Sequence, residues 1–270
     1  MQKFKNFIFN LNQLSVLSVS GDDALKFLQG QLTNDISLAT STQSVHAGFC
    51  NPKGRLLAFF HIIKYLDNYL LFFPKSIAEI ITKKLSMYIL RSNVKLDLDP
   101  EKLMYFGLYT NNQDGQLGTL NTLPKNEMES INEQSLIVTK LPSDGLRVII
   151  VGDKKNCMNL IGNNSNKLEK KSFDDWIAHN IKSGIPNIYH ETQETFIPQS
   201  INLDIISAIN FKKGCYTGQE IVARTHYLGK PKRRMYKASF HSESQPLYGQ
   251  TLLDGEESVG QVVDVAHIDN

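Results

Sequence analysis

The sequence is poor in cysteine, with only Cys50, Cys157 and Cys215 among its 270 residues. The number is odd, the spacings are wide and no C-x-x-C pair occurs, which excludes a disulfide framework and a zinc ribbon. The seven histidines show no H-x-H or H-x-x-x-H spacing, so the sequence predicts no stably bound metal. This usage is typical of reduced thiols in the cytoplasm.

The sequence also lacks an excess of either charge and any long apolar run. Lys and Arg number 29 and Asp and Glu 27, a net charge of +2, which argues against direct RNA binding because RNA binders usually carry a basic excess. The most apolar stretch, residues 56–66, contains His61 and Lys64 and is too short and polar to span a membrane. The N-terminus has no signal-peptide pattern. We therefore expect a cytoplasmic protein without membrane contact.

The apolar pattern predicts an α+β fold, and the length suggests about two domains. Strands are predicted at residues 14–20, 45–50, 55–65, 69–73, 103–109, 136–141 and 146–151. Polar composition predicts surface loops at 111–134 and 162–171, and the chain from Arg234 onward has the pattern of a small antiparallel β domain.

Three helices have boundary signals. They are predicted over 24–29, from 77 to about 90, and from 173 to about 183. The expected boundary residues are Ser76 with Glu79 and Ser172 with Asp175 as capping boxes, and Gly30 and Gly184 as C-terminal ends.

The segment 196–234 contains the cysteine with the most distinctive setting. Thr217 and Glu220 have capping-box spacing, which predicts a helix starting at Gly218 and a hydrophobic staple between its flanking residues Tyr216 and Ile221. Cys215 would then lie just before a helix N-terminus, whose partial positive charge favours the thiolate.

The neighbours of Cys215 support the same expectation. Lys212 and Lys213 add positive charge, and Gly214 would let the backbone turn tightly. The alternative is that Cys215 is a small buried hydrophobe, as lone cysteines usually are, and the local sequence leaves both open. Cys50 and Cys157 are predicted to be structural.

The stretch from Lys213 to Glu220 resembles the K-G-C-Y-x-G-Q-E signature of the YgfZ family, a branch of the glycine-cleavage T-protein superfamily. The segments 21–35 (GDDALKFLQGQLTND), 51–58 (NPKGRLLA) and 174–186 (DDWIAHNIKSGIP) are similar to further family motifs. The resemblance implies a GcvT-like, multi-lobed α+β fold with antiparallel sheets, a central channel and a short C-terminal β-barrel. It divides the chain into a folate-binding region, 1–229, and a barrel domain, 230–270.

The resemblance also implies functional residues. Tetrahydrofolate or a derivative is expected in the channel, with Trp176 matching one of two family tryptophans and Leu14 standing in place of the other. Without the resemblance, Trp176 on its apolar helix face would more often be core. The implied residues around the thiol are Lys213, Gly214, Cys215, Tyr216, Gly218, Gln219 and Glu220. The implied folate contacts are Trp176, Asn34, Asp35, Arg55 and Arg224.

Three functions are weighed. The first is a folate-dependent accessory protein for iron–sulphur assembly or repair, acting on partners such as a radical tRNA-methylthiolating enzyme, with Cys215 as the working thiol. One cysteine cannot supply the usual cluster ligands, which argues against a resident cluster. The second is an aminomethyltransferase. Leu57 and Ala58 occupy the places of its acid pair and cannot transfer protons. Asp35 is the remaining acid, at a position where aspartate usually caps or turns the chain.

The third function is direct RNA binding. Its only local support is the basic cluster Lys230, Lys232, Arg233 and Arg234. A charge run this short more often forms a solvated face, and it could also meet the carboxylates of a folate tail.

Overall fold

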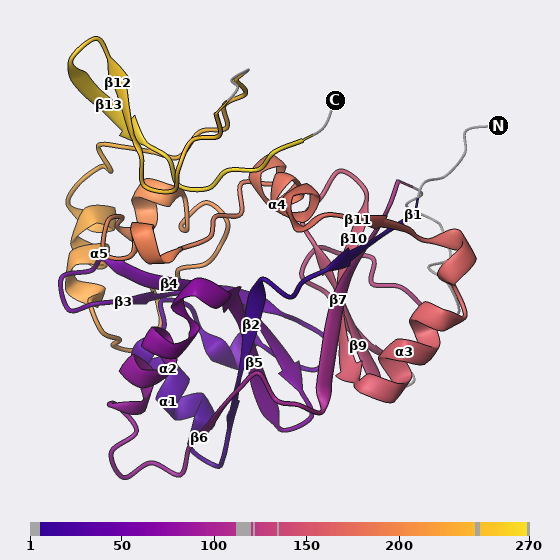
Figure 1. Cartoon of the computed structure of the whole chain (residues 1–270). Helices are drawn as coiled ribbons and strands as arrows, with labels where there is room; N and C mark the ends of the chain where they lie inside the picture. Colours follow the sequence, from indigo (N-terminus) through magenta and orange to yellow (C-terminus); the bar gives the residue numbers. More distant parts are fainter. Residues whose placement is uncertain (1–5, 112–119, 121, 134, 241–243, 269–270) are drawn as a thin grey trace.

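The computed structural model describes residues 6–111, 120, 122–133, 135–240 and 244–268, which form two stacked sheets flanked by helices (Figure 1). The first sheet has five strands in the order β3-β4-β5-β2-β6, and all its neighbours are antiparallel. Its elements are β2 (Leu14–Ser20), β3 (Val45–Cys50), β4 (Leu56–Tyr65), β5 (Asn68–Pro74), β6 (Lys95–Leu98), α1 (Ala24–Gln31) and α2 (Ala78–Ser86).

The second sheet has six strands in the order β11-β1-β7-β10-β9-β8. Only β1 and β11 are parallel; the other pairs are antiparallel. Its elements are β1 (Asn6–Asn10), β7 (Leu103–Thr110), β8 (Ser130–Glu133), β9 (Leu136–Leu141), β10 (Leu146–Asp153), α3 (Lys154–Gly162) and β11 (Glu169–Lys171). The mixed helix and strand content, with mainly antiparallel pairing, confirms the predicted α+β class.

The core lies in layers because strand residues alternate between faces. On β5, Leu71 and Phe73 point toward α1 and α2, whereas Leu70 and Phe72 point toward the second sheet. A third apolar layer joins the second sheet to α3, and a fourth covers β3 and β4 with the chain between residues 185 and 222. The face between the two sheets is therefore buried on both sides.

The helix α4 (Phe173–Lys182) follows its predicted start. Ser172 accepts a hydrogen bond from the Asp175 N–H at 3.1 Å, and the Asp175 carboxylate accepts one from the Ser172 N–H at 3.0 Å, so the capping box is formed. Gly184, with φ +69°, ends the helix in the left-handed conformation that glycine adopts without strain. This helix lies beside β1, where it presents Trp176 to the core.

Several predicted boundaries are wrong. α1 continues through Gly30 to Gln31. α2 has no side-chain cap from Ser76, because a 3₁₀ turn precedes it, and it ends at Ser86 rather than near residue 90. The predicted loops 111–134 and 162–171 contain β8 and β11, although residues 112–119, 121 and 134 lie outside the described part. Edge strands this short and polar carry almost no periodic signal.

The end of the chain contains α5 (Gln219–Tyr227) and one hairpin, β12 (Thr251–Asp254) with β13 (Glu257–Gln261), which projects from the body (Figure 1). Within 230–240 and 244–268 no other strand forms, so the described residues make a two-stranded hairpin rather than the expected barrel. The 3₁₀ helices are η1 (Ile36–Leu38), η2 (Lys75–Ile77), η3 (Ser165–Lys167), η4 (His190–Thr192) and η5 (Pro198–Ile201).

Candidate functional site

Three segments far apart in the sequence meet around Cys215. The Lys213 side chain reaches the C-terminal end of α1, and the Thr217 N–H donates to the Gly30 carbonyl at 3.3 Å. Gly218 lies against the turn 51–54. The KGCYTGQE loop, the end of the GDDALKFLQGQLTND segment and the NPKG turn therefore form one surface region, which we call the Cys215 loop region.

Two glycines allow this close approach. Gly218 has φ +80°, and a Cβ there would overlap the Asn51 carbonyl oxygen. Gly54 has φ +68°, and a Cβ there would lie 2.8 Å from the Ile221 Cβ. Because side chains at these two positions would push the turn and the loop apart, the glycines of both motifs are required by packing.

The predicted capping box at α5 is not formed. The helix begins at Gln219, after Gly218 in the left-handed conformation, and has no side-chain cap. The Thr217 hydroxyl hydrogen-bonds to Gln31 at 3.3 Å instead of to the helix. Tyr216 is buried and Ile221 is 38% exposed against Gly54, so the predicted staple is also absent. A tertiary hydrogen bond has replaced the local cap that the spacing predicts.

Lys213 does not serve the thiol as expected. Its ammonium donates to the carbonyls of Gln29, Leu32 and Asn34 at 2.8, 2.7 and 2.9 Å, where α1 and the following loop leave carbonyls unpaired. Burial lowers the pKa of Lys213 to about 8. The ammonium also lies 5.2 Å from the centroid of the Tyr216 ring, whose burial raises the pKa of its hydroxyl. Both side chains anchor the loop.

Cys215 is exposed, whereas Cys50 and Cys157 are buried, which confirms that the latter two are structural. Burial raises the pKa of each buried thiol to about 12. Gly214 is exposed, and a Cβ there would meet no atom within 4 Å. The thiol therefore stands on a loop held firmly on both sides and open to solvent. Its reactivity stays a prediction.

The other predicted residues near the loop are spread over two surfaces. Gln219 and Glu220 form the first turn of α5, and Arg224 follows on the same helix. Glu220 and Arg224 are exposed, and neither forms an ion pair with another described residue. The Arg55 guanidinium donates to the Thr195 carbonyl at 2.5 Å. The structure brings Arg55 close to the NPKG turn and assigns it no functional contact.

Asn34 and Asp35 have structural partners. Buried Asn34 donates from its side-chain nitrogen to the His46 carbonyl at 2.7 Å and the Ser207 carbonyl at 2.8 Å. Asp35 caps η1 by accepting from the Ser37 N–H at 3.0 Å, as aspartate usually does at such a position. The hydrogen bond from the Ser37 hydroxyl keeps the pKa of Asp35 below its usual value, which makes this carboxyl a poor proton donor.

Trp176 is 1% exposed in the layer between the sheets. Its ring lies 5.3 Å from the Phe9 ring, and a Cβ at Gly107 would lie 2.5 Å from it, so Gly107 makes room for the indole. The Arg147 guanidinium lies 4.9 Å from the ring centroid. Leu14 is also buried in this layer, and its carbonyl accepts a hydrogen bond from Tyr105. These contacts are those of a core tryptophan, and its contact with folate stays a prediction.

The sequence analysis missed a buried polar cluster beside Trp176. Arg147 on β10 has no exposed surface, donates to Asn180 and to the Pro142 carbonyl at 2.9 Å each, and leaves its Nε without a partner among the described residues. No salt bridge joins Arg147 to a described carboxylate. An arginine inside the apolar run LRVIIV was the available signal, because charged residues are almost never fully buried unless paired.

His46 on β3 and His61 on β4 complete this group, which we call the Arg147 cluster. Their rings lie 5.1 Å apart, and both ring nitrogens of His61 lack a partner among the described residues. Burial, together with the charge of Arg147, lowers the pKa of His46 to about 3 and that of His61 well below its usual value. Burial also lowers the pKa of Arg147 to about 9, so at neutral pH the cluster has one buried cation and two neutral imidazoles.

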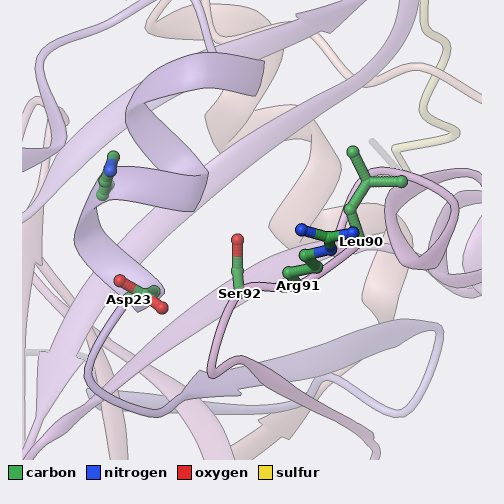
Figure 2. A pocket seen from close by; sticks show the side chains of 5 residues that line it. Asp23, Leu90, Arg91 and Ser92 are labelled. Carbon is green, nitrogen blue, oxygen red and sulfur yellow. The ribbon is translucent and has the colours of Figure 1, made fainter.

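The remaining searches give limited results. Among the described residues, no group of three or more His, Cys, Asp and Glu side chains is placed to hold a metal ion. No helix in the described part of the chain is long and apolar enough to cross a membrane. A shallow depression at the N-terminal end of α1 contains none of the predicted site residues (Figure 2). Its lining residues are Asp23, Lys26, Leu90, Arg91 and Ser92.

Comparison with solved structures defines the class of fold. The chain superimposes on the glycine cleavage system aminomethyltransferase T of Bartonella henselae with a TM-score of 0.67, covering 93% of this chain and 71% of that one. The two sequences are 14% identical, so the likeness concerns the fold alone.

Sequence comparison defines the family. No protein-family model matches the chain. The chain is 31% identical over 257 residues to the tRNA-modifying protein YgfZ of Aliivibrio fischeri strain MJ11, covering 94% of this chain and 76% of that protein. It is also 31% identical over 244 residues to the tRNA-modifying protein YgfZ of Hamiltonella defensa, covering 90% and 72%. The chain belongs to the YgfZ family.

Proposed function

We propose that the chain is a folate-binding accessory protein of the cytoplasm that supports assembly or repair of iron–sulphur clusters and thereby tRNA modification, with Cys215 as its working thiol. Two general findings support a role of this kind. The relatives are named tRNA-modifying proteins, and the fold is that of a glycine-cleavage aminomethyltransferase. Resemblance to that superfamily implies tetrahydrofolate as the ligand, and a radical tRNA-methylthiolating enzyme would be a partner.

The observation that carries the folate assignment is the unpaired Arg147. A fully buried guanidinium without a carboxylate is costly, because its charge is removed from water without a compensating partner. A folate carries a planar heterocycle with several hydrogen-bond acceptors, and it ends in carboxylates. The Arg147 Nε–H can donate to such an acceptor, and the unpartnered ring nitrogens of His61 can accept or donate beside it. The residues present therefore fit this ligand.

The Cys215 loop region supports the second half of the proposal. An exposed thiol on a loop fixed by Lys213 and Tyr216 is accessible to a protein partner. One thiolate cannot hold a cluster alone, so the partner would supply the remaining ligands. Aminomethyl transfer is the weaker candidate, because Leu57 and Ala58 are buried in the apolar layer against α1 and α2 and offer no acid–base group.

Folate binding is tested with tetrahydrofolate and purified protein. Trp176 is the only tryptophan, so saturable quenching of its fluorescence reports a ligand near it. Because Arg147 itself lies over the indole, affinity is also measured by equilibrium dialysis, which does not depend on fluorescence. Arg147→Met should weaken binding at least about tenfold, which corresponds to the loss of one charged hydrogen bond. The exposed Arg91→Met serves as the control. Equal affinity of the two variants would overturn the assignment.

The thiol is tested by complementation of cells that lack their own family member, with tRNA methylthiolation as the readout. Cys215→Ala should fail to restore the modification. Gly214→Ala changes the adjacent exposed residue without removing the thiol and should restore it. Full rescue by Cys215→Ala would show that the sulphur has no part in the function.

A further inference from the structure

The C-terminal end of α5 contains an exposed group of aromatic rings that the proposed function does not use. The His226 and Phe211 rings stack with centroids 3.7 Å apart and planes 11° from parallel. The Tyr227 ring meets both edge-on, at 4.8 and 6.2 Å, and its hydroxyl reaches the Phe211 carbonyl at 3.5 Å. Tyr227 is nevertheless 64% exposed, and the following Leu228 is 82% exposed. The stack therefore holds an aromatic ring at the surface rather than covering it.

The same segment concentrates basic charge. Residues 211–234 contain seven Lys and Arg residues and one acidic residue, Glu220, in a chain whose net charge is only +2. Lys213 binds carbonyls, and Arg234 pairs with Asp204 at 2.6 Å. The other five are exposed and form no ion pair with a described residue. They are Lys212, Arg224, Lys230, Lys232 and Arg233. Figure 1 shows α5 at the edge of the molecule, where these side chains face no other element of the body.

We propose that this surface binds single-stranded RNA. Basic side chains around exposed aromatic rings are the arrangement by which proteins bind unpaired nucleotides, with phosphates on the cations and a base stacked on a ring. An acidic protein segment would also satisfy the five cations, but it would have no planar group for Tyr227. A duplex could meet the cations, but its bases are already stacked and unavailable. The combination of free cations and an exposed ring therefore favours an unpaired RNA segment.

The near-neutral total charge does not oppose this assignment, because it averages a local basic surface with acidic residues elsewhere. The inference goes beyond the proposed function and needs neither folate nor the thiol. Phe211 precedes Cys215 by four residues, so bound RNA would lie beside the Cys215 loop region. RNA binding and folate binding can consequently fail independently.

The test measures fluorescence anisotropy of a labelled single-stranded 12-nucleotide RNA with the whole chain. Tyr227→Ala should weaken binding at least about fivefold, the lower end of the effect of losing one stacked base. Tyr227→Phe keeps the ring and should bind like the unchanged protein. Lys232→Ala with Arg233→Ala should lower the slope of log affinity against log salt by about 1.4, at about 0.7 for each single-strand phosphate.

Leu90→Ala with Arg91→Ala, an exposed apolar and basic pair in the depression of Figure 2, is the matched control and should leave binding unchanged. Circular dichroism verifies that each variant is folded. Unlabelled duplex RNA and polyglutamate are the competitors, and both should displace the probe poorly. The proposal is overturned if Tyr227→Ala binds as well as the unchanged protein, or if either competitor matches single-stranded RNA.

Discussion

The Cys215 loop region and the Arg147 cluster solve opposite problems. In the loop region, Lys213 and the glycines bind their surroundings completely, and the one reactive group is left in solvent. In the cluster, a cation and two imidazoles are shut between two sheets, and several of their polar atoms have no partner among the described residues. A satisfied frame around an exposed atom suits contact with a macromolecule, whereas unsatisfied buried atoms suit a small ligand.

The largest expected effect comes from breaking the frame of the Cys215 loop region. Gly218→Ala should lower the free energy of unfolding by about 3 kcal/mol, because alanine is strained at φ +80° and its Cβ would overlap the Asn51 carbonyl. Gly214→Ala, four residues earlier, meets no atom and should change it by less than about 0.5 kcal/mol. Urea denaturation of both variants measures the difference. Similar values would mean that the loop does not depend on its contact with the NPKG turn.

A smaller loss is expected at Lys213. Lys213→Met keeps the aliphatic chain but leaves three carbonyls without their donor, which should cost about 2 kcal/mol. Lys212→Met removes an exposed charge and should cost less than about 0.5 kcal/mol. Thermal and urea denaturation compare the two neighbours. If both lysines proved equally dispensable, the anchoring of the loop to α1 would be refuted.

The smallest effect sharpens the other side of the comparison, through pH. His46 has a pKa of about 3 in the folded chain and an ordinary value of 6.5 when unfolded, because burial disfavours its charged form. Below pH 6.5 the unfolded chain binds a proton that the folded chain refuses, so stability is present above pH 6.5 and is lost as pH falls toward 3. At pH 5.5 the loss is about 1.4 kcal/mol.

His46→Leu should remove that part of the acid sensitivity. The difference between the variant and the unchanged protein at pH 8, where His46 is neutral in both states, reports packing alone. The change in that difference between pH 8 and 5.5 then measures the protonation effect. An unchanged pH profile in the variant would show that His46 is protonated in the folded chain.

Periodic patterns predicted the parts of the fold that local sequence controls. Buried strands such as β4 and β10 are long apolar runs, and α4 has a capping box that is complete within four residues. The edge strands β8 and β11 depend on a neighbouring strand for half their hydrogen bonds, so their own sequences gave no signal. The same limit explains the failed cap at α5, where Thr217 binds Gln31 across 186 residues rather than its own helix.

The site was predicted in part for the same reason. The family motif identified the loop that carries Cys215, but it could not show that Lys213 faces α1 instead of the thiol. The Arg147 cluster joins residues from three strands in two sheets, and no spacing along the chain encodes that contact. Only the presence of a charged residue in a buried strand pointed to it.

The separation of β1 and β2 has a consequence for synthesis on the ribosome. These strands are joined by only Leu11, Asn12 and Gln13, yet they belong to different sheets. The first sheet is complete once β6 has emerged, whereas β1 must wait for β7 before it has any hydrogen-bonding neighbour. During that interval the nascent chain exposes a free apolar strand, and translation pauses before residue 110 would prolong its exposure to chaperones or aggregation.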